Sequence, residues 1–148
     1  MTNPSKERGT RGETRVLRHM YKRLQDERLR RQALSGARDR GDIGGIFAHG
    51  WQGIAEVKNL REEPGPKLLR VWMAQTVAER ENADAGFAVL VVLRAGKAVG
   101  RAYAYVTIRD LARICIGLDS HREDHDGRWV CMTLDECCDL IGGASDER

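Results

Sequence analysis

Three ionisable side chains, Asp42, Glu56 and Lys58, lie in two segments whose pattern otherwise predicts β-strands. The segments are Asp42–Phe47 and Gly53–Lys58, and a glycine-containing turn joins them, as in a β-hairpin. Because successive side chains of a strand point to opposite faces, Glu56 and Lys58 lie on the same face. We expect Asp42 to face the same side, while the apolar residues of both strands pack on the other.

This pattern indicates metal-assisted chemistry on a phosphate group. Two carboxylates on adjacent strands form an oxygen-rich site that suits Mg²⁺ or Mn²⁺. Without a cation, such a pair is destabilised because its like charges repel and both lose hydration. A divalent cation offsets both effects, lowers the pKa of a bound water and stabilises the charge of a phosphoryl transition state. The ammonium group of Lys58 can neutralise the pair or hold a water beside a bound phosphate.

Two helices are expected to flank this hairpin. Residues Arg11–Asp26 carry apolar side chains at helical spacing, and Glu13 lies three and four residues before members of that apolar stripe. We therefore expect its carboxylate to point inward or along the edge of the core. Residues Leu68–Asp84 predict a second amphipathic helix, in which Gln75 interrupts the apolar face.

The other segments complete an α/β pattern, a mixed central β-sheet flanked by helices. A short strand is expected near Arg31–Leu34. The continuous apolar run Phe87–Leu93 predicts a buried strand and is far too short to span a membrane. Further along, we expect a strand over residues 101–108, a short helix over 109–118, and a strand followed by a short helix over 127–143. That last helix opens on Thr133, with Glu136 at capping-box spacing.

The chain length of 148 residues suits one domain with a substantial core. We expect a flexible basic arm over residues 1–10 and a single domain over residues 11–148. Within it, the core covers about 11–107 and a C-terminal extension covers about 108–148. The N-terminus lacks the apolar stretch of a secretory signal, so we expect a cytoplasmic protein whose four cysteines are free thiols.

Charge is distributed unevenly along the chain. Residues 1–40 contain 12 Lys/Arg and 5 Asp/Glu, whereas residues 119–148 contain 3 and 9. A basic end favours a polyanionic partner such as nucleic acid. Solvated charge on helix faces is an equally simple explanation of the asymmetry taken alone.

Asp42, followed after a short hairpin by Glu56-Val57-Lys58, resembles the motif of the PD-(D/E)XK nucleases. That family has a restriction-endonuclease-like core in which a helix, three strands, a helix and a strand follow one another (αβββαβ). Over roughly Arg11 to Thr107, the arrangement is similar to the archaeal and phage Holliday-junction resolvases. The resemblance implies a homodimeric, Mg²⁺-dependent endonuclease, with Mn²⁺ as a substitute, that cleaves branched DNA to 5′-phosphate and 3′-hydroxyl ends.

The resemblance also implies roles for individual residues. Lys58 would orient or activate the attacking water, and Glu13 would reach the metal from the first helix. Gln75 would supply the polar side chain that many such nucleases keep near the site. The implied catalytic residues are Asp42, Glu56, Lys58, Glu13 and Gln75. The implied metal ligands are Asp42, Glu56, Glu13 and the main-chain carbonyl of Val57.

DNA contacts are expected from the basic N-terminal region and from the loop before the hairpin. Ser35 in that loop resembles the loop serine of resolvases, and its neighbouring arginines would lie near the scissile phosphate. The candidate DNA-binding residues are Arg11, Arg15, Ser35, Arg38, Arg40 and Lys67. Where the family often has a proline before the first carboxylate, this chain has Gly41, which makes Asp39 a rival of Asp42.

Other interpretations of the same residues stay open. Glu56 and Lys58 could form a salt bridge on a solvated sheet face, and the fold could bind nucleic acid without cutting it. A nuclease of restriction or repair type is a further alternative. The segment His121–His125, with Cys131 and Cys137, offers four possible zinc ligands. It lacks the paired spacing of structural zinc sites, so we do not expect zinc.

Overall fold

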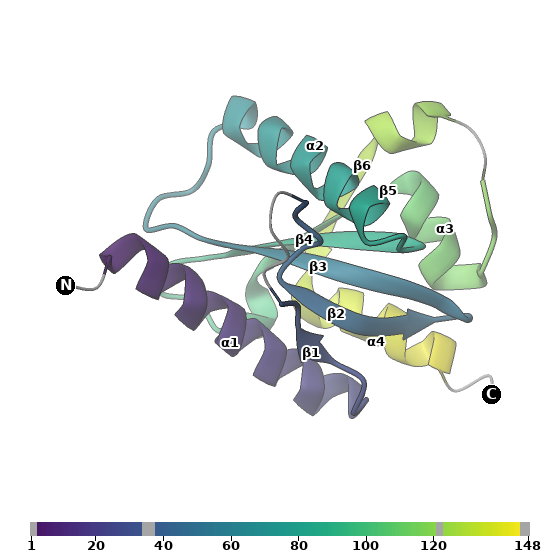
Figure 1. The fold of residues 1–148 in the computed structure, drawn as a ribbon, viewed down its shortest axis with the longest axis horizontal. Coiled ribbons are helices and arrows are strands. Elements are labelled where there is room, and N and C mark those ends of the chain that lie inside the picture. The colour runs from purple at the N-terminus through teal and green to yellow at the C-terminus, as the bar shows by residue number, and fades with distance from the viewer. Residues whose placement is uncertain (1–2, 34–37, 121–122, 146–148) are drawn as a thin grey trace.

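The computed structural model of the chain describes residues 3–33, 38–120 and 123–145. In this described part, the sheet has six strands and is accompanied by four α-helices and two short 3₁₀ segments (Figure 1). The elements in chain order are α1 (Pro4–Leu24), β1 (Arg30–Arg31), β2 (Ile43–Ala48), β3 (Trp51–Asn59), α2 (Pro66–Asn82), β4 (Phe87–Leu93), η1 (Val99–Arg101), β5 (Tyr103–Thr107), α3 (Ile108–Ile116), η2 (Glu123–Gly127), β6 (Trp129–Thr133) and α4 (Leu134–Ser145).

The sheet is mixed and open, and its strands lie side by side in the order of the chain, from β1 to β6. Neighbouring strands are antiparallel except β3 and β4, which run parallel because α2 carries the chain back between them. This architecture confirms the expected α/β class with a mixed central sheet flanked by helices.

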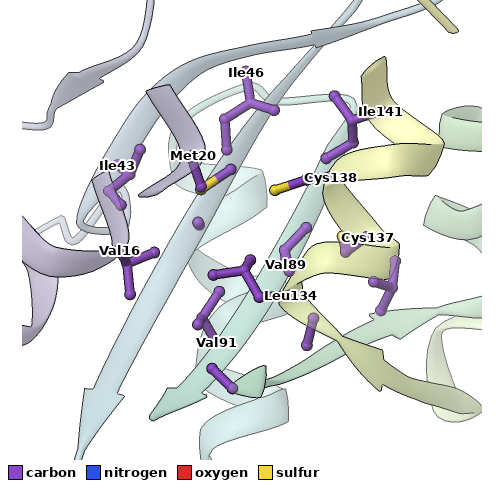
Figure 2. Packing of buried hydrophobic residues seen from close by; sticks show 14 of the residues in the cluster. Val16, Met20, Ile43, Ile46, Val89, Val91, Leu134, Cys137, Cys138 and Ile141 are labelled. Atoms are coloured by element: carbon purple, nitrogen blue, oxygen red, sulfur yellow. The ribbon is translucent and has the colours of Figure 1, made fainter. Parts of the chain in front are cut away.

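The helices cover the two faces of the sheet unequally. Side chains of α1, α3 and α4 pack on one face and form the larger apolar core, part of which Figure 2 shows around Met20, Val89 and Ile141. Helix α2 packs on the other face, where Trp72 meets Leu90 and Val92 of β4. The side chains of β3 divide accordingly, because alternate residues point to opposite faces.

The alternation in β3 decides which surface carries charge. Ala55 and Val57 belong to the larger core, whereas the Lys58 ammonium lies 5.6 Å from the ring centre of Trp72 on α2. Glu56 and Lys58 therefore share the α2 face, as the period of two predicts. The face that could have been a solvated surface is covered by a helix, so its charged groups are held in a partly enclosed space.

The first helix is longer than the sequence pattern predicts. It begins at Pro4, and the Asn3 side chain caps it by accepting a hydrogen bond of 3.1 Å from the Ser5 N–H. Residues 4–10, expected as a flexible arm, are therefore helical. A proline in the first turn after an asparagine cap is a strong helix start, and it outweighs the polar composition of this stretch.

One further boundary differs from expectation, and one signal is confirmed. The short strand β1 comprises only Arg30–Arg31, earlier than the expected Arg31–Leu34. The capping box at the start of α4 forms: the Glu136 N–H donates to Thr133 Oγ1 at 3.1 Å, and the Thr133 N–H donates to Glu136 Oε1 at 3.2 Å. In the part of the chain that the structure describes, no helix is both long and apolar enough to cross a membrane.

Candidate metal centre

Carboxylates from three segments converge between β3 and α2. Glu56 comes from β3, Glu79 from the C-terminal half of α2, and Asp39 from the segment that precedes β2. One oxygen from each lies within 4.8 Å of the others. Asp42, just before β2, adds a fourth carboxylate, whose charge acts on both Glu56 and Glu79.

Asp42 is held at the site by main-chain hydrogen bonds. Its Oδ2 accepts from the Val57 N–H at 2.8 Å, and its own N–H donates to the Ala55 carbonyl at 3.0 Å. Because Ala55 and Val57 are the neighbours of Glu56 in β3, these two bonds fix Asp42 beside Glu56. Burial, and then the charge of Glu56, raises the pKa of Asp42 to about 8, even though the Val57 N–H favours the ionised form.

Glu56 and Glu79 are more than nine-tenths buried, with 5% and 6% of their surfaces exposed. Burial raises the pKa of Glu56 to about 8, and the neighbouring Glu79 adds to the effect. Burial likewise raises the pKa of Glu79 to about 7. The Oε2 atom of each carboxylate is buried without a hydrogen-bond partner among the described residues. Buried carboxylate oxygens are normally satisfied, so this pair calls for a proton or a cation.

Lys58 and Glu13 lie at the margin of the cluster. The Lys58 Nζ is 3.5 Å from Glu56 Oε1, and its positive charge lowers the pKa of that carboxyl against the larger effect of burial. Glu13, on α1, contributes to the raised pKa of Asp42 through its charge. Its own carboxylate is occupied by an ion pair with Arg31 of β1, 2.5 Å away. Glu13 is therefore near the site but shared with a structural partner.

Gln75 does not belong to the cluster, because its side chain is exposed on the outer face of α2. The inward stripe of this helix is formed by Trp72, Thr76 and Glu79, at spacings of four and three residues. Sequence reasoning missed Glu79, because the stripe that passes through Leu68 and Gln75 is rotated about the helix axis from the stripe that faces the sheet. The signal was the position of Glu79 relative to Trp72, which is seven residues earlier on the same face.

Asp39, the rival of Asp42, joins the cluster instead of replacing Asp42. The Asp39 carbonyl accepts from Asn82 Nδ2 of α2 at 2.9 Å, and its Oδ1 accepts from the Gly41 N–H at 2.9 Å. Asp39 is exposed, so it forms the solvent side of the site, opposite the buried Glu56 and Glu79. The two candidates thus occupy different positions around the same space.

The expected DNA-binding residues are spread over several elements. All of those described are exposed: Arg11 and Arg15 on α1, Arg38 and Arg40 before β2, and Lys67 at the start of α2. Ser35 lies outside the described residues. Arg38 and Arg40 flank Asp39 in the chain, so of these candidates they are the nearest in sequence to a member of the carboxylate cluster.

The possible zinc ligands that the structure describes lie on three different elements, η2, β6 and α4. The ring of His125 hydrogen-bonds to Ser120 Oγ at 2.8 Å. Cys131 is an exposed residue of β6, whereas Cys137 is buried in the larger core. His121 lies outside the described residues. The carboxylate cluster, in contrast, offers only oxygen ligands, which suits a hard cation such as Mg²⁺ better than zinc.

Comparisons with known proteins assign no family. Neither a family model, nor a curated protein, nor a solved structure matches this chain. The chemistry of the site therefore follows from its own side chains. These are four carboxylates, two of them buried with an oxygen that lacks a partner among the described residues, and one lysine 3.5 Å from Glu56.

Proposed function

We propose that this chain is a metal-dependent, structure-selective DNA endonuclease of the PD-(D/E)XK type. Its proposed substrate is a Holliday junction, hydrolysed to 5′-phosphate and 3′-hydroxyl ends. The observation that carries the proposal is the pair of buried, unpartnered oxygens of Glu56 and Glu79, beside Lys58 on one face of the sheet. Left ionised without a cation, these groups are costly to bury, whereas a divalent cation could be bound by both carboxylates.

Each residue of the cluster has a role in this proposal. Glu56, Glu79 and Asp39 would hold the ion, and the main-chain carbonyl of Val57 is a further ligand implied by the resemblance. When bound, Mg²⁺ supplies an activated water and charge neutralisation at the phosphate. Asp42, fixed by its two main-chain hydrogen bonds, would complete the negative site.

Lys58 would act on the substrate. Its ammonium group is close to Glu56 but one-quarter exposed, so it can donate a hydrogen bond to the attacking water or to a phosphate oxygen. Glu13, already paired with Arg31, would raise the pKa of Asp42 through its charge instead of binding the ion itself. Gln75, exposed on α2, has no role in this proposal.

The arrangement of elements supports the family assignment. From α1 to β4, the order is helix, three strands, helix and strand, and β4 runs parallel to β3. The carboxylates lie at the start of β2, within β3 and in the helix that follows. A motif as short as an acidic residue followed by Glu-x-Lys occurs often by chance, so this position in the fold carries more weight than the residues alone.

Junction resolution requires two symmetric nicks, which implies a homodimer with two such sites. The exposed Arg38, Arg40 and Lys67 would contact the DNA backbone, as would Arg11 and Arg15 of α1. DNA as substrate is compatible with the expected cytoplasmic location. Size-exclusion chromatography with light scattering at micromolar concentration tests the dimer, and a monomer would contradict it.

The decisive experiment compares cleavage of a labelled four-way junction with that of a linear duplex of the same sequence. Each substrate is incubated in Mg²⁺ or in EDTA with the wild type, Glu56→Gln and the control Glu62→Gln. Glu62 is an exposed glutamate in the loop after β3, so its loss removes the same charge away from the cluster. We expect paired nicks on the junction in Mg²⁺ with the wild type and the control only.

The other outcomes separate the parts of the proposal. Cleavage of both substrates would keep the metal-dependent nuclease and reject the junction specificity. Junction binding without cleavage, unchanged in Glu56→Gln, would show that the fold binds DNA without catalysis. Cleavage that persists in EDTA would reject the metal dependence.

A further inference from the structure

Five arginines from three separate segments line one recess of about 340 Å³. They come from α1, from the residues after β3 and from the residue after β4: Arg8, Arg11, Arg15, Arg61 and Arg94. The rest of the described lining is uncharged and not aromatic. Such a lining can attract an anion but offers no ring on which a nucleobase could stack.

The fold brings these arginines together by a close contact between α1 and β3. Arg8, Arg11 and Arg15 follow each other at spacings of three and four residues, so they share one face of the helix. Gly12 lies between them, and a β-carbon at this position would be only 2.8 Å from the Asn59 Cβ. Asn59 Nδ2 also donates to the Arg8 carbonyl at 3.0 Å. The glycine thus lets the arginine face of α1 meet the end of β3.

Most of these arginines have no counter-ion among the residues that the structure describes. In the described ranges, Arg8, Arg11, Arg15 and Arg61 form no side-chain ion pair. Among the described residues, Arg94 pairs with Glu63 at 3.8 Å and lies over the Tyr103 ring at 4.4 Å, and its buried Nε has no hydrogen-bond partner there. Guanidinium groups stay charged at all physiological pH values, so their mutual repulsion persists until an anion binds.

The recess begins at Asn59, the residue that follows Lys58 in β3. The Asn59 side chain faces Gly12 of α1, so the recess lies at the carboxyl end of β3 on the α1 side of the sheet, whereas Glu56 and Lys58 face α2. Because Arg11, Arg15 and Arg61 are exposed, a long polymer can lie across them instead of being confined in a closed cavity. Arginine contacts to successive phosphates position a nucleic acid without reading its sequence.

We infer that this recess binds the phosphate backbone of a nucleic-acid strand at the carboxyl ends of β3 and β4, on the side of the sheet that α1 covers. The ligand class rests on the proposed nuclease function, but the binding itself requires no metal. Each arginine–phosphate contact releases counterions, with a slope of about −0.9 in log K against log salt on duplex DNA. Loss of two arginines should therefore reduce the slope by about 1.8.

The test measures binding of a fluorescein-labelled four-way junction by anisotropy in EDTA, from 50 to 300 mM NaCl. The variants are Arg11→Ala, Arg61→Ala and the double substitution, with Arg128→Ala as control. Arg128 is exposed and precedes β6, at the opposite end of the sheet. Because the substituted side chains are exposed, circular dichroism should show the wild-type fold. We expect about 10-fold weaker binding at 50 mM NaCl for each single variant. The two losses should add in binding free energy in the double variant. The control should bind like the wild type.

Three results would overturn the inference. Unchanged affinity and salt slope in the double variant would show that the strand lies elsewhere. An equal loss in Arg128→Ala would show that only net charge matters. If titration with inorganic tripolyphosphate saturates a site that the double variant lacks, while junction binding is unaffected, the recess takes a small anion. Absence of cleavage in Mg²⁺, together with the expected binding losses, would reject the nuclease and keep this site.

Discussion

Replacement of Glu56 by glutamine tests directly whether the carboxylate cluster is built for a cation. The substitution keeps the shape of the side chain but removes its charge. In metal-free buffer at pH 8, the wild type must keep Glu56, Glu79 and Asp42 close together while they ionise. We therefore expect Glu56→Gln to be more stable than the wild type under these conditions, although it replaces a residue of the proposed active site.

The size of the effect follows from the raised pKa. A carboxyl group with a higher pKa in the folded than in the unfolded state binds its proton more tightly when folded. The wild type should therefore lose stability as the pH rises from about 4.5 to about 8, the two values for Glu56. Each pKa unit of difference between the folded and unfolded states corresponds to about 1.4 kcal/mol. This puts an upper limit of several kcal/mol on the contribution of Glu56 to the pH dependence of stability.

A bound divalent cation should raise the stability of the folded protein, whereas ionisation of the carboxylates without a cation lowers it. At 100 times its dissociation constant, Mn²⁺ should stabilise the wild type by about 2.7 kcal/mol, or raise its Tm by roughly 8 °C for a chain of this size. Glu56→Gln should gain much less. The assay is thermal unfolding followed by tryptophan fluorescence at pH 5, 6, 7 and 8, in EDTA or in Mn²⁺, with Glu62→Gln as the matched control.

Two results would refute this reasoning. If Mn²⁺ raises the Tm of Glu56→Gln as much as that of the wild type, the ion does not bind at Glu56. If the wild type and Glu56→Gln show the same dependence of Tm on pH in EDTA, Glu56 is not a buried carboxylate with a raised pKa. The control Glu62→Gln should follow the wild type in both tests.

Three further predictions concern other residues. Glu79→Gln should lower Mn²⁺ affinity in calorimetry at least about 10-fold, whereas Gln75→Ala should leave it unchanged; equal affinities would remove Glu79 from the site. Gly12→Ala should destabilise the protein by about 1–3 kcal/mol in urea unfolding, because its β-carbon would crowd the end of β3, and a neutral effect would show that α1 can shift. Arg80→Met should cost about 3–5 kcal/mol, since it leaves the buried Asp110 without its 3.0 Å ion pair; a Tm within 2 °C of the wild type would contradict this.

The local pattern of the sequence was sufficient for much of the fold. Alternation in β3 placed Glu56 and Lys58 on one face and Ala55 on the other, because a strand has a period of two whatever it packs against. The apolar run of β4 predicted a buried strand, and the capping box predicted the start of α4. Helix α1 starts earlier than predicted because the Asn3 cap and Pro4 outweigh the polar composition of the residues that follow.

The membership of the carboxylate cluster required the tertiary structure. Sequence reasoning treated Asp39 and Asp42 as alternatives, yet the chain folds so that both surround the same space. It selected Gln75, which is exposed, and passed over Glu79, which lies on the stripe of α2 that faces the sheet. A helical pattern defines a stripe, but an error of one residue in that stripe changes which polar side chain faces the sheet.

The sequence by itself determined the class of fold and the faces of individual strands and helices, because these depend on periodicities within one segment. Only the tertiary structure decided how the segments register against each other. It joined Glu79 to Glu56, separated Gln75 from the cluster, and gathered the arginines of α1 with Arg61 and Arg94. Those contacts depend on how closely α1 and α2 approach the sheet, which is set by side-chain packing between distant segments.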